Sequence, residues 1–390
     1  MPIKILHIIE PLVGGTRTHI LQILDGLPRS EFEQSLICSV ERDPSFMSEV
    51  ERLRAEGVLV RVVPMKRNPS VIPDFRAFIR LYRFLSHHRY DVVHTHSSKA
   101  GIVGRLAAFL ARAPHIVHTP HVFPFTQPAP QYRQAVYRLG ETLLGSLTDR
   151  IIAVSAWQRS LAVEHGIGTK DSVALIHNGV TVETLRRGGC SRGEGRARVR
   201  EELGAKPSDL LVGTAGRLTL QKGQKYLLEA VAILLDRHPH LRFYIVGSGE
   251  LEQKLRGMIE QLSWCRQRIA FLPERADFSD LLAATDIFVM PSLWEGMPYA
   301  LLEAMAAERP VICTNVCGLD EVVKDGENGL LIPPADSRAV AAAISRLVTD
   351  RALRKRLGTA ARRTVQERFR LEEKLELLAQ LYRDLAGAGK

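Results

Sequence analysis

Short apolar runs, rich in β-branched residues, alternate with amphipathic stretches along the whole chain. The runs predict strands over residues 3–9, 35–40, 59–63, 91–95, 115–119, 150–154 and 173–176 in the first half, and over 210–215, 242–246, 268–272, 286–290, 310–313 and 329–332 in the second. The stretches between them predict helices over 16–27, 75–87, 100–111, 132–147, 224–237, 251–262, 299–307 and 340–349. Strands that are each followed by a helix are typical of parallel sheets covered by helices on both faces.

This alternation is interrupted once, near the middle of the chain. Residues 186–195 are rich in glycine and have no apolar period, so we interpret residues 186–205 as a linker. The fold class is therefore α/β, with two Rossmann-like, doubly wound parallel-sheet domains over residues 1–185 and 206–368. The last segment, residues 369–390, repeats leucine at helical spacing and predicts an amphipathic helix. Its apolar face must dock on a neighbouring surface, and the first domain, reached across the junction, is a candidate.

The composition is that of an ordinary globular protein, with 45% hydrophobic and 25% charged residues among 390. The five cysteines form no CxxC pair, as expected for reduced thiols. We see no signal peptide and no apolar run long enough for a transmembrane helix, so we predict a cytoplasmic protein. The net charge of +10 fits a nucleic acid, an anionic membrane or a phosphorylated substrate as partner. No zinc-finger spacing, RNP motif or lysine-rich tail is present, which argues against nucleic acid.

Two glutamates, Glu295 and Glu303, flank the point where one predicted strand passes into a helix. The strand over 286–290 ends at Pro291, and the helix begins after Pro298, a position at which proline is tolerated. In a parallel α/β sheet this loop is where ligands bind. The free N–H groups at the helix start would face an anion, and the carboxylates would accept hydrogen bonds from sugar hydroxyls. A site for both a phosphate and a polyol indicates a nucleotide sugar.

Glycine turns follow the first strand of each half. Gly14 and Gly15 follow the strand over 3–9 and permit close approach of a phosphate to the backbone. The G-x-G-x-x-G pattern of a dinucleotide site is absent there. In the second half, Arg217 and Lys222 lie in the corresponding loop. Two cations at this place would neutralise a diphosphate leaving group, as a metal ion does in other transferases.

A group of histidines lies at two neighbouring strand ends of the first half. His94 and His96 alternate on one strand, so their rings point to the same face, and His118 and His121 lie at the end of the next strand. The grouping would suit zinc, but no cysteine or carboxylate completes a site at ligand spacing. A neutral histidine that positions a sugar is the better interpretation, and we expect no metal.

Taken in order along the chain, these stretches resemble the retaining glycosyltransferases of family 4, whose GT-B fold has two domains facing across a cleft. The resemblance rests on Gly14-Gly15, on residues 91–96, 119–121, 177–180, 216–218, 221–223 and 246–249, and on the Glu-x7-Glu pair Glu295 and Glu303. It implies transfer of a sugar from a nucleoside-diphosphate sugar, with retention at the anomeric carbon. It also implies that no cofactor and no essential metal take part.

The same resemblance assigns roles to residues of the second half. Arg217 and Lys222 would hold the diphosphate, while Glu295 would contact the donor sugar and Glu303 the ribose. The other expected contacts with the nucleotide sugar are Gly14, Gly15, Gly247, Leu272, Gly296, Met297, Tyr299, Ala300 and Leu301. Of these, Leu272 would neighbour the base.

In the first half, the resemblance places His121, or alternatively His118, near the reacting carbon. One position departs from the family pattern. Such enzymes often have Ser-x-x-Glu after the strand that ends at residue 154, whereas this chain has Ser155 followed by Gln158. The change would affect acceptor binding or packing and leave the donor chemistry unaltered.

The predicted enzyme would build a bacterial surface polysaccharide or glycolipid on a sugar- or lipid-linked acceptor. A glycosyltransferase for a soluble small-molecule acceptor is the first alternative. An epimerase or phosphorylase on the same fold, or a sugar-nucleotide-binding protein without turnover, are further alternatives. The donor base, the donor sugar and the acceptor stay open.

The predicted helix over 75–88 carries arginines at 76, 80 and 83 beside aromatic residues. Residues 121–132 form a loop rich in proline and aromatic residues in the same half. We hypothesise that this basic, aromatic half docks on an anionic membrane as a peripheral contact, to reach a lipid-linked acceptor. An ordinary amphipathic helix, packed on the sheet with its arginines in solvent, is the alternative.

Overall fold

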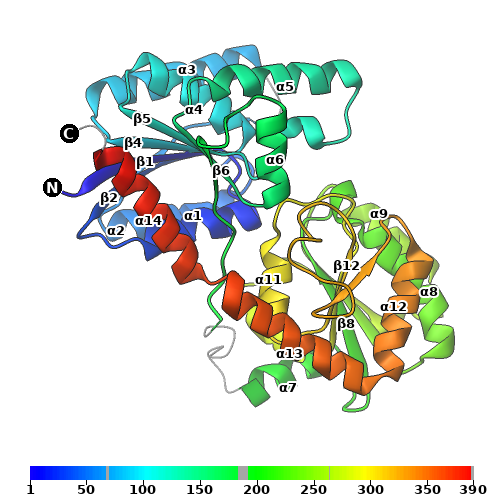
Figure 1. Ribbon diagram of the computed structural model, residues 1–390. Helices are drawn as coiled ribbons and strands as arrows, with labels where there is room; N and C mark the ends of the chain where they lie inside the picture. Colours follow the sequence, from blue (N-terminus) through cyan, green and yellow to red (C-terminus); the bar gives the residue numbers. More distant parts are fainter. Residues whose placement is uncertain (67–69, 183–191, 263, 388–390) are drawn as a thin grey trace. The chain divides into compact units, whose positions relative to one another are not determined.

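The computed structural model describes residues 1–66, 70–182, 192–262 and 264–387 (Figure 1). Contacts divide the chain into two compact units. The first unit comprises Met1–Asn178 together with Glu373–Lys390, and the second comprises Gly179–Glu372. Each unit is a parallel sheet flanked by helices, which confirms the predicted doubly wound α/β class.

The first unit contains a seven-stranded parallel sheet in the order β3-β2-β1-β4-β5-β6-β7. Its strands are β1 Ile3–Ile9, β2 Phe32–Cys38, β3 Leu59–Val62, β4 Val92–His96, β5 His115–Thr119, β6 Arg150–Ala153 and β7 Val173–Leu175. Strand order reverses between β1 and β4, where His7 pairs in register with His94. The carboxyl ends of these two strands are therefore a topological switch point, the usual place for a site.

The helices of the first unit cover both faces of this sheet. They are α1 Gly15–Gly26, α2 Met47–Ala55, α3 Val71–His87, α4 Ser98–Leu110, α5 Gln131–Gly145, α6 Ala156–Glu164 and α14 Leu371–Gly387, with short 3-10 turns at Pro44–Phe46 and Pro124–Thr126. On one face, α3 and α4 pack over Leu6 and Val93 of the strands. On the other, Ile23 of α1 and Tyr382 of α14 pack over Ile5. The C-terminal helix thus completes the core of the first unit.

The second unit contains a six-stranded parallel sheet in the order β10-β9-β8-β11-β12-β13. Its strands are β8 Leu210–Ala215, β9 Leu241–Val246, β10 Ile269–Leu272, β11 Ile287–Met290, β12 Val311–Thr314 and β13 Leu330–Ile332. Its helices are α7 Arg192–Glu202, α8 Gln224–Arg237, α9 Glu252–Gln261, α10 Phe278–Ala284, α11 Tyr299–Ala306, α12 Ser337–Thr349 and α13 Arg351–Arg368, with 3-10 turns at Leu220–Lys222 and Arg266–Arg268. Here the order reverses between β8 and β11.

The region interpreted as a linker, residues 186–205, is only partly a linker. Residues 186–191 lie outside the described part of the chain, but residues 192–202 form helix α7. Arg196 and Arg200 of this helix both bind the Asp286 carboxylate, at 3.1 Å and 3.0 Å. Long-range ion pairs of this kind, which a local glycine-rich composition does not reveal, explain why the expectation of a loop was wrong there.

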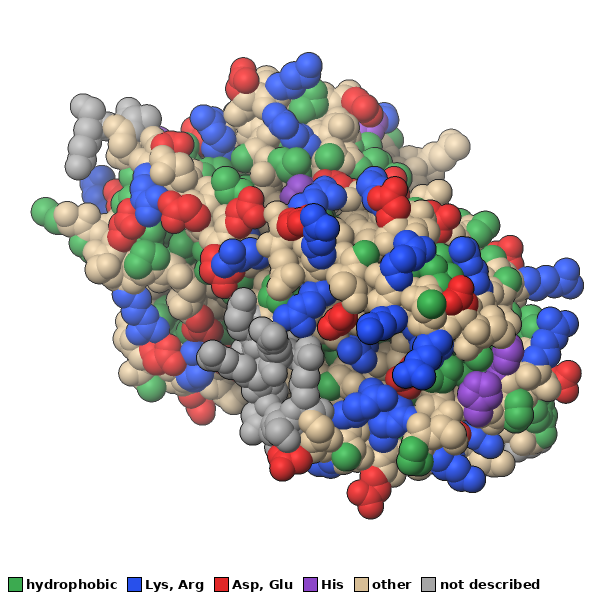
Figure 2. Space-filling model, turned by 60° about the horizontal axis from the view of Figure 1, so that its bottom comes forward, with side chains coloured by type: hydrophobic (Ala, Val, Ile, Leu, Met, Phe, Trp, Pro, Cys, Tyr) green, Lys and Arg blue, Asp and Glu red, His purple; other side chains and the backbone are tan. Residues whose placement is uncertain are grey.

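Helices α2, α6, α10 and α13 were not predicted either. In α13 the apolar residues form a narrow stripe, Leu353, Leu357, Ala361 and Val365, within a strongly basic segment. The helix carries seven arginines and lysines against a single acid, Glu367. Lys and Arg side chains are also numerous over the face shown in Figure 2. Among the described helices, none is both long and apolar enough to cross a membrane.

Candidate functional site

Two glycine turns close against each other at the carboxyl ends of β8 and β9. Gly216 and Gly247 have φ angles of 144° and 142°, a region that favours glycine. A Cβ on Gly247 would lie 2.1 Å from the Gly216 carbonyl oxygen, so the two backbones touch without room for a side chain. The Gly247 N–H donates to the Leu272 carbonyl at 3.1 Å. The pairing of β9 with β10 therefore brings together two of the expected contact residues, Gly247 and Leu272.

An ion pair joins the loop before α8 to the loop before α11. Lys222 Nζ lies 2.6 Å from Glu295 Oε1, and the two side chains are only 16% and 5% exposed. Ser292 Oγ donates to the same carboxylate oxygen at 2.7 Å, which fixes the Glu295 side chain. The left-handed Gly223 (φ 61°) allows this approach, because a Cβ there would lie 2.0 Å from the Pro291 carbonyl oxygen. Two sequence-predicted residues are thus direct partners.

Glu303 lies on the second turn of α11 and is half-buried. Burial raises the pKa of its carboxyl to about 7. Burial, reinforced by the Glu303 charge, also raises the pKa of Tyr299 well above its ordinary value. Helix α11 begins after Pro298 without a side-chain cap and without an acid in its first turn, so its positive end suits an anion. An anion-binding end and a carboxyl acceptor therefore lie one turn apart.

The other expected contacts of the second unit take three kinds of position. Arg217 is half-buried in the loop after β8, five positions before Lys222. Gly296 and Met297 are buried in the loop before α11, where a Cβ on Gly318 would lie only 2.0 Å from the Gly296 carbonyl oxygen. Ala300 is half-buried and Leu301 is fully buried, and both belong to the first turn of α11. Leu301 packs its side chain in the core, so only its backbone can meet a ligand.

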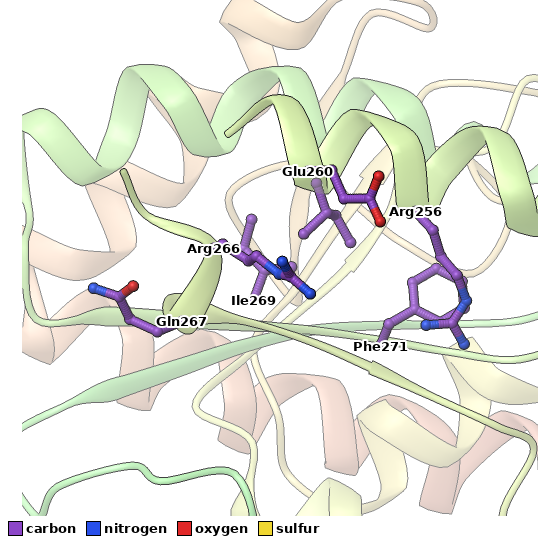
Figure 3. Close-up of a pocket in the computed structure, with 7 residues that line it drawn as sticks. Arg256, Glu260, Arg266, Gln267, Ile269 and Phe271 are labelled. Carbon is purple, nitrogen blue, oxygen red and sulfur yellow. The ribbon is translucent and has the colours of Figure 1, made fainter. Parts of the chain in front are cut away.

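A separate pocket of about 430 Å³ lies between α9 and the edge strand β10 (Figure 3). Arg256 stacks over the ring of Phe271, with its guanidinium carbon 4.1 Å from the ring centroid. Glu260 and Arg266 line the same pocket. Successive strand residues point to opposite faces, so Phe271 and Leu272 face opposite sides of the sheet. The pocket is therefore distinct from the glycine turns.

In the first unit, five histidines from three elements and one loop meet at the switch point. They are His7 on β1, His19 on α1, His94 and His96 on β4, and His121 after β5. As their alternation predicts, the β4 rings lie on one side, with centroids 4.0 Å apart. His7 Nδ1 lies 3.2 Å from His96 Nε2, and His94 Nδ1 lies 2.6 Å from the Tyr382 hydroxyl of α14. Together they form a buried polar network that sequence alone did not assemble.

The network is held in its neutral form by burial. Burial lowers the pKa of His7 to about 4 and that of His121 to about 3. It also lowers the pKa of the fully buried Lys374 on α14 to about 7. Lys374 Nζ lies 3.3 Å from His19 Nδ1 and 2.9 Å from Gln22 Oε1. Uncharged imidazoles therefore predominate at neutral pH.

Two groups of three histidines have ring nitrogens within 4.8 Å of one another: His7, His94 and His96, and His19, His96 and His121. In the first group, five of the six ring nitrogens already have hydrogen-bond partners. In the second, His96 Nδ1 and His121 Nε2 have none among the described residues. However, the Lys374 amine contacts His19 Nδ1 at 3.3 Å, and in its protonated form it would repel a metal cation. The arrangement suits hydrogen bonding better than metal binding.

His121 has a left-handed backbone, with φ of 58°. Gln158 Nε2 donates to the His121 carbonyl at 3.0 Å, while Gln158 Oε1 accepts from the Val154 N–H at 2.9 Å. A carboxylate cannot donate, so glutamine rather than glutamate is required for both contacts. His118, by contrast, is fully buried under α4, where its ring packs against Gly101. Gln158 is a functional candidate that the sequence marked only as a departure.

The expected glycine pair of the first unit lies at the start of α1. Gly14 is the N-cap of this helix, with φ of 54°, and Gly15 is its first residue. A Cβ on Gly14 would meet nothing within 4 Å, so the space beside the turn is open. The turn therefore leaves room for a ligand, whereas the glycine turns of the second unit pack against each other.

Both units match family models. Residues 195–364 match the model described as glycosyl transferases group 1, and residues 14–179 match the glycosyl transferase 4-like domain. The chain is 32% identical over 386 residues to the UDP-Gal:alpha-D-GlcNAc-diphosphoundecaprenol alpha-1,3-galactosyltransferase of Escherichia coli, covering 98% of this chain and 97% of that one. It is 21% identical to the capsular polysaccharide biosynthesis glycosyltransferase CapM of Staphylococcus aureus, over 93% and 96% of the two chains. The structure of HepE from Anabaena in complex with UDP-glucose superposes with a TM-score of 0.81 at 22% identity, covering 98% and 99%.

Proposed function

The chain belongs to the glycosyl transferases group 1 family and has the GT-B fold, and we propose that its donor is a nucleoside-diphosphate sugar whose anomeric configuration is retained. The observation that carries this proposal is the Lys222–Glu295 pair beside the uncapped end of α11. A half-buried cation, a buried acceptor and a helix N terminus together suit a diphosphate attached to a polyol. UDP-glucose is the ligand of the superposable HepE structure, which supports the same class of donor.

Each donor group has a separate role in this proposal. Lys222 and Arg217 neutralise the charge that develops on the departing diphosphate, where such contacts contribute most to the rate. Glu295, fixed by Ser292, accepts hydrogen bonds from donor-sugar hydroxyls. Glu303 accepts from the ribose hydroxyls. To bind the diphosphate, Lys222 must give up part of its contact with the Glu295 carboxylate. Donor binding therefore frees Glu295 to accept hydrogen bonds from the donor sugar.

Retention is proposed on the basis of the family. The bond from the anomeric carbon to the diphosphate oxygen breaks, and the acceptor oxygen bonds to the same face of that carbon. The acceptor proton passes to the departing phosphate oxygen, so a nucleoside diphosphate leaves and no protein nucleophile is required. His121, with its buried and unpartnered Nε2, is the candidate for positioning the sugar.

We propose a lipid-linked acceptor at the surface of an anionic membrane, in the synthesis of a surface polysaccharide or glycolipid. The E. coli relative, which this chain matches over nearly its full length, is named for a diphosphoundecaprenol-linked acceptor. CapM is named for capsular polysaccharide biosynthesis. We propose a hexose as the donor sugar, because the E. coli relative is named for UDP-Gal and the HepE structure contains UDP-glucose.

Thermal-shift measurements with UDP-, GDP- and ADP-glucose test the donor class. A ligand that binds only the folded state stabilises it by about 2.7 kcal/mol at a concentration of 100 times its Kd. We expect one base to raise the unfolding midpoint clearly more than the other two. The absence of a shift with all three would overturn the nucleotide-sugar proposal. The proton coupling constant of the product's anomeric carbon then tests retention, because inversion would give the opposite anomer.

A further inference from the structure

Large apolar side chains gather in solvent on three consecutive helices of the first unit. Twelve of the eighteen large hydrophobic side chains that are exposed in the described residues lie on α3, α4 and α5, four on each. They are Val71, Ile72, Phe75 and Tyr82, then Ile102, Leu106, Phe109 and Leu110, and finally Tyr132, Val136, Leu139 and Leu143. Helix α4 packs against both α3 and α5, which lie along the same side of this unit (Figure 1). We name this surface the α3–α5 face.

Helix α5 presents its apolar residues as a stripe. Tyr132, Val136, Leu139 and Leu143 follow one another at spacings of four, three and four, which places them on one side of a helix. Each is 60–65% exposed, whereas the buried residues of α5 are Glu141 and Gly145. An apolar stripe turned outward is the reverse of what packing on a sheet requires. Contiguous exposed surface of this kind marks an interaction site.

The charges around the stripe have one sign. Exposed arginines lie at positions 76, 80 and 83 on α3 and at 133 and 138 on α5. The two acids of the three helices are already neutralised. Asp74 pairs with Lys99 at 2.5 Å, and the buried Glu141 pairs with the buried Arg105 at 2.7 Å. The α3–α5 face is therefore both apolar and cationic.

These features select a lipid surface over a second copy of the chain. A symmetric dimer would place the same patch against itself, so its arginines would face arginines with no free acid to pair them. An anionic bilayer offers phosphates to the arginines and a hydrocarbon boundary to the stripe at the same time. Because no described helix is able to span a membrane, the contact would lie in the plane of the interface.

We propose that the α3–α5 face docks on an anionic lipid bilayer, with the α5 stripe in the boundary between headgroups and acyl chains. This docking would bring the enzyme to the lipid-linked acceptor proposed above, and in that biological role it rests on the proposed function. Its physical basis is independent, because it derives from exposure and charge on helices outside the donor loops. It also shifts the expected contact, since the sequence pointed to the helix over 75–88 and the loop over 121–132, and the structure adds α4 and α5.

Co-sedimentation of the whole protein with vesicles tests the docking. Phosphatidylcholine vesicles with and without phosphatidylglycerol are the probes, at low and at high salt. We expect binding to the anionic vesicles that weakens as salt rises. The variant Val136→Gln/Leu139→Gln/Leu143→Gln should lower the partition coefficient at least about tenfold, because buried methylene groups drive insertion. Arg76→Glu/Arg80→Glu/Arg83→Glu should lower it by about two orders of magnitude, since each basic residue near the surface contributes about fivefold.

Helix α13 provides the matched control. It carries exposed cations at 351, 355 and 356 but no exposed large hydrophobic side chain among its residues. The variant Arg351→Glu/Lys355→Glu/Arg356→Glu makes the same charge change as the α3 variant, and it should leave vesicle binding within about twofold. Equal losses on α3 and α13 would overturn the proposal, because general electrostatics would then explain the binding. Absence of binding to anionic vesicles at low salt would also overturn it. So would a wild-type dimer in solution that becomes a monomer in the stripe variant.

The thermal shift with UDP-, GDP- and ADP-glucose separates this proposal from the proposed function. The stripe variant should keep the wild-type shift with whichever nucleotide sugar binds, because its residues lie outside the donor loops. Vesicle binding without any nucleotide-sugar shift would refute the proposed donor and leave the docking intact. A normal shift without vesicle binding would refute the docking alone.

Discussion

The two units gather chemically different side chains at equivalent positions of their sheets. Each is a doubly wound sheet whose strand order reverses once, and each gathers polar side chains at the carboxyl ends of the strands beside that reversal. In the first unit the gathered groups are imidazoles that hydrogen-bond to one another and to Tyr382. In the second they are a cation and an anion, Lys222 and Glu295, joined across two glycine-shaped loops.

This difference in charge follows from the residues in the loops at the strand ends of each unit. The loop after β8 contributes Arg217 and Lys222, and the loop after β11 contributes the carboxylate that one of them binds. In the first unit, Arg17 on α1 pairs with Asp43 at 3.2 Å. Burial lowers the pKa of His7 and His121, so these imidazoles are uncharged at neutral pH. One fold therefore places a charged site and an uncharged polar site at equivalent points.

Breaking the charged pair should have the largest effect. Lys222→Ala and Glu295→Ala should each reduce sugar transfer by at least about two orders of magnitude, the scale for losing a charged transition-state contact. Because the two groups are partners, the double variant should lose less than the product of the single losses. Initial rates at saturating acceptor provide the measurement.

A lysine of the same region is the control for this test. Lys225, whose amine lies 4.5 Å from the Tyr226 ring centroid, belongs to the neighbouring helix and not to the pair. Lys225→Ala should keep most of the activity. Near-normal turnover in both Lys222→Ala and Glu295→Ala would show that the chemistry does not use this pair.

Acid should loosen the first unit before the second. The folded-state pKa of His7 is about 4 and that of His121 about 3, below the ordinary value of 6.5. Between pH 6.5 and these values the unfolded chain binds more protons, so stability is lost as the pH falls, by up to about 1.4 kcal/mol per pH unit for each group. The protection of β1 and β4 amides from hydrogen exchange, taken relative to the intrinsic exchange rate at each pH, should therefore fall from pH 6.5 toward pH 4. An equal loss of protection in β8 and β9 would remove the distinction between the units.

Local sequence patterns account for the architecture and for the residues that meet in the candidate site of the second unit. Short apolar runs rich in β-branched residues predicted the strands, and the loops at strand ends pointed to Lys222 and Glu295, because a parallel sheet brings its carboxyl ends together. Helix α13 was not predicted because its apolar stripe is only one residue wide and lies within a basic segment. The loop expectation at residues 192–202 failed because Asp286, far along the chain, stabilises α7.

The histidine network lay beyond sequence reasoning for a related reason. Tyr382 reaches His94 across 288 positions, and Lys374 reaches His19 across 355. No local pattern encodes contacts at such separations. Gln158 was visible only as a missing acid, although its two hydrogen bonds, to Val154 and His121, explain why an amide is present. The sequence therefore identified position 158 as a departure from the family pattern, but it did not reveal the two hydrogen-bond partners.

A glycine in each unit tests whether the second site is the more tightly built. Gly223 and Gly14 both have positive φ, so alanine strains either backbone by about 1–3 kcal/mol. At Gly223 the new Cβ would also lie 2.0 Å from the Pro291 carbonyl oxygen, whereas at Gly14 it would meet nothing within 4 Å. Gly223→Ala should therefore lower the unfolding midpoint by several degrees more than Gly14→Ala. A larger loss for Gly14→Ala would contradict the packing difference.

The pH dependence of donor binding distinguishes Glu303 from the ion pair beside it. Burial sets the pKa of the Glu303 carboxyl to about 7 in the free protein, and an ionised carboxylate is the better acceptor for ribose hydroxyls. If the bound state requires the ionised form, the affinity for UDP-glucose should fall about tenfold from pH 8 to pH 6, as the ionised fraction falls from about nine-tenths to about one-tenth. UDP-glucose is a suitable probe because its diphosphate diester does not titrate in this range. Glu303→Gln should weaken binding at pH 8 and make it independent of pH, whereas Lys222→Ala should weaken binding and keep the slope. A slope that survives in Glu303→Gln would assign the proton to another group and remove Glu303 from the ribose contact.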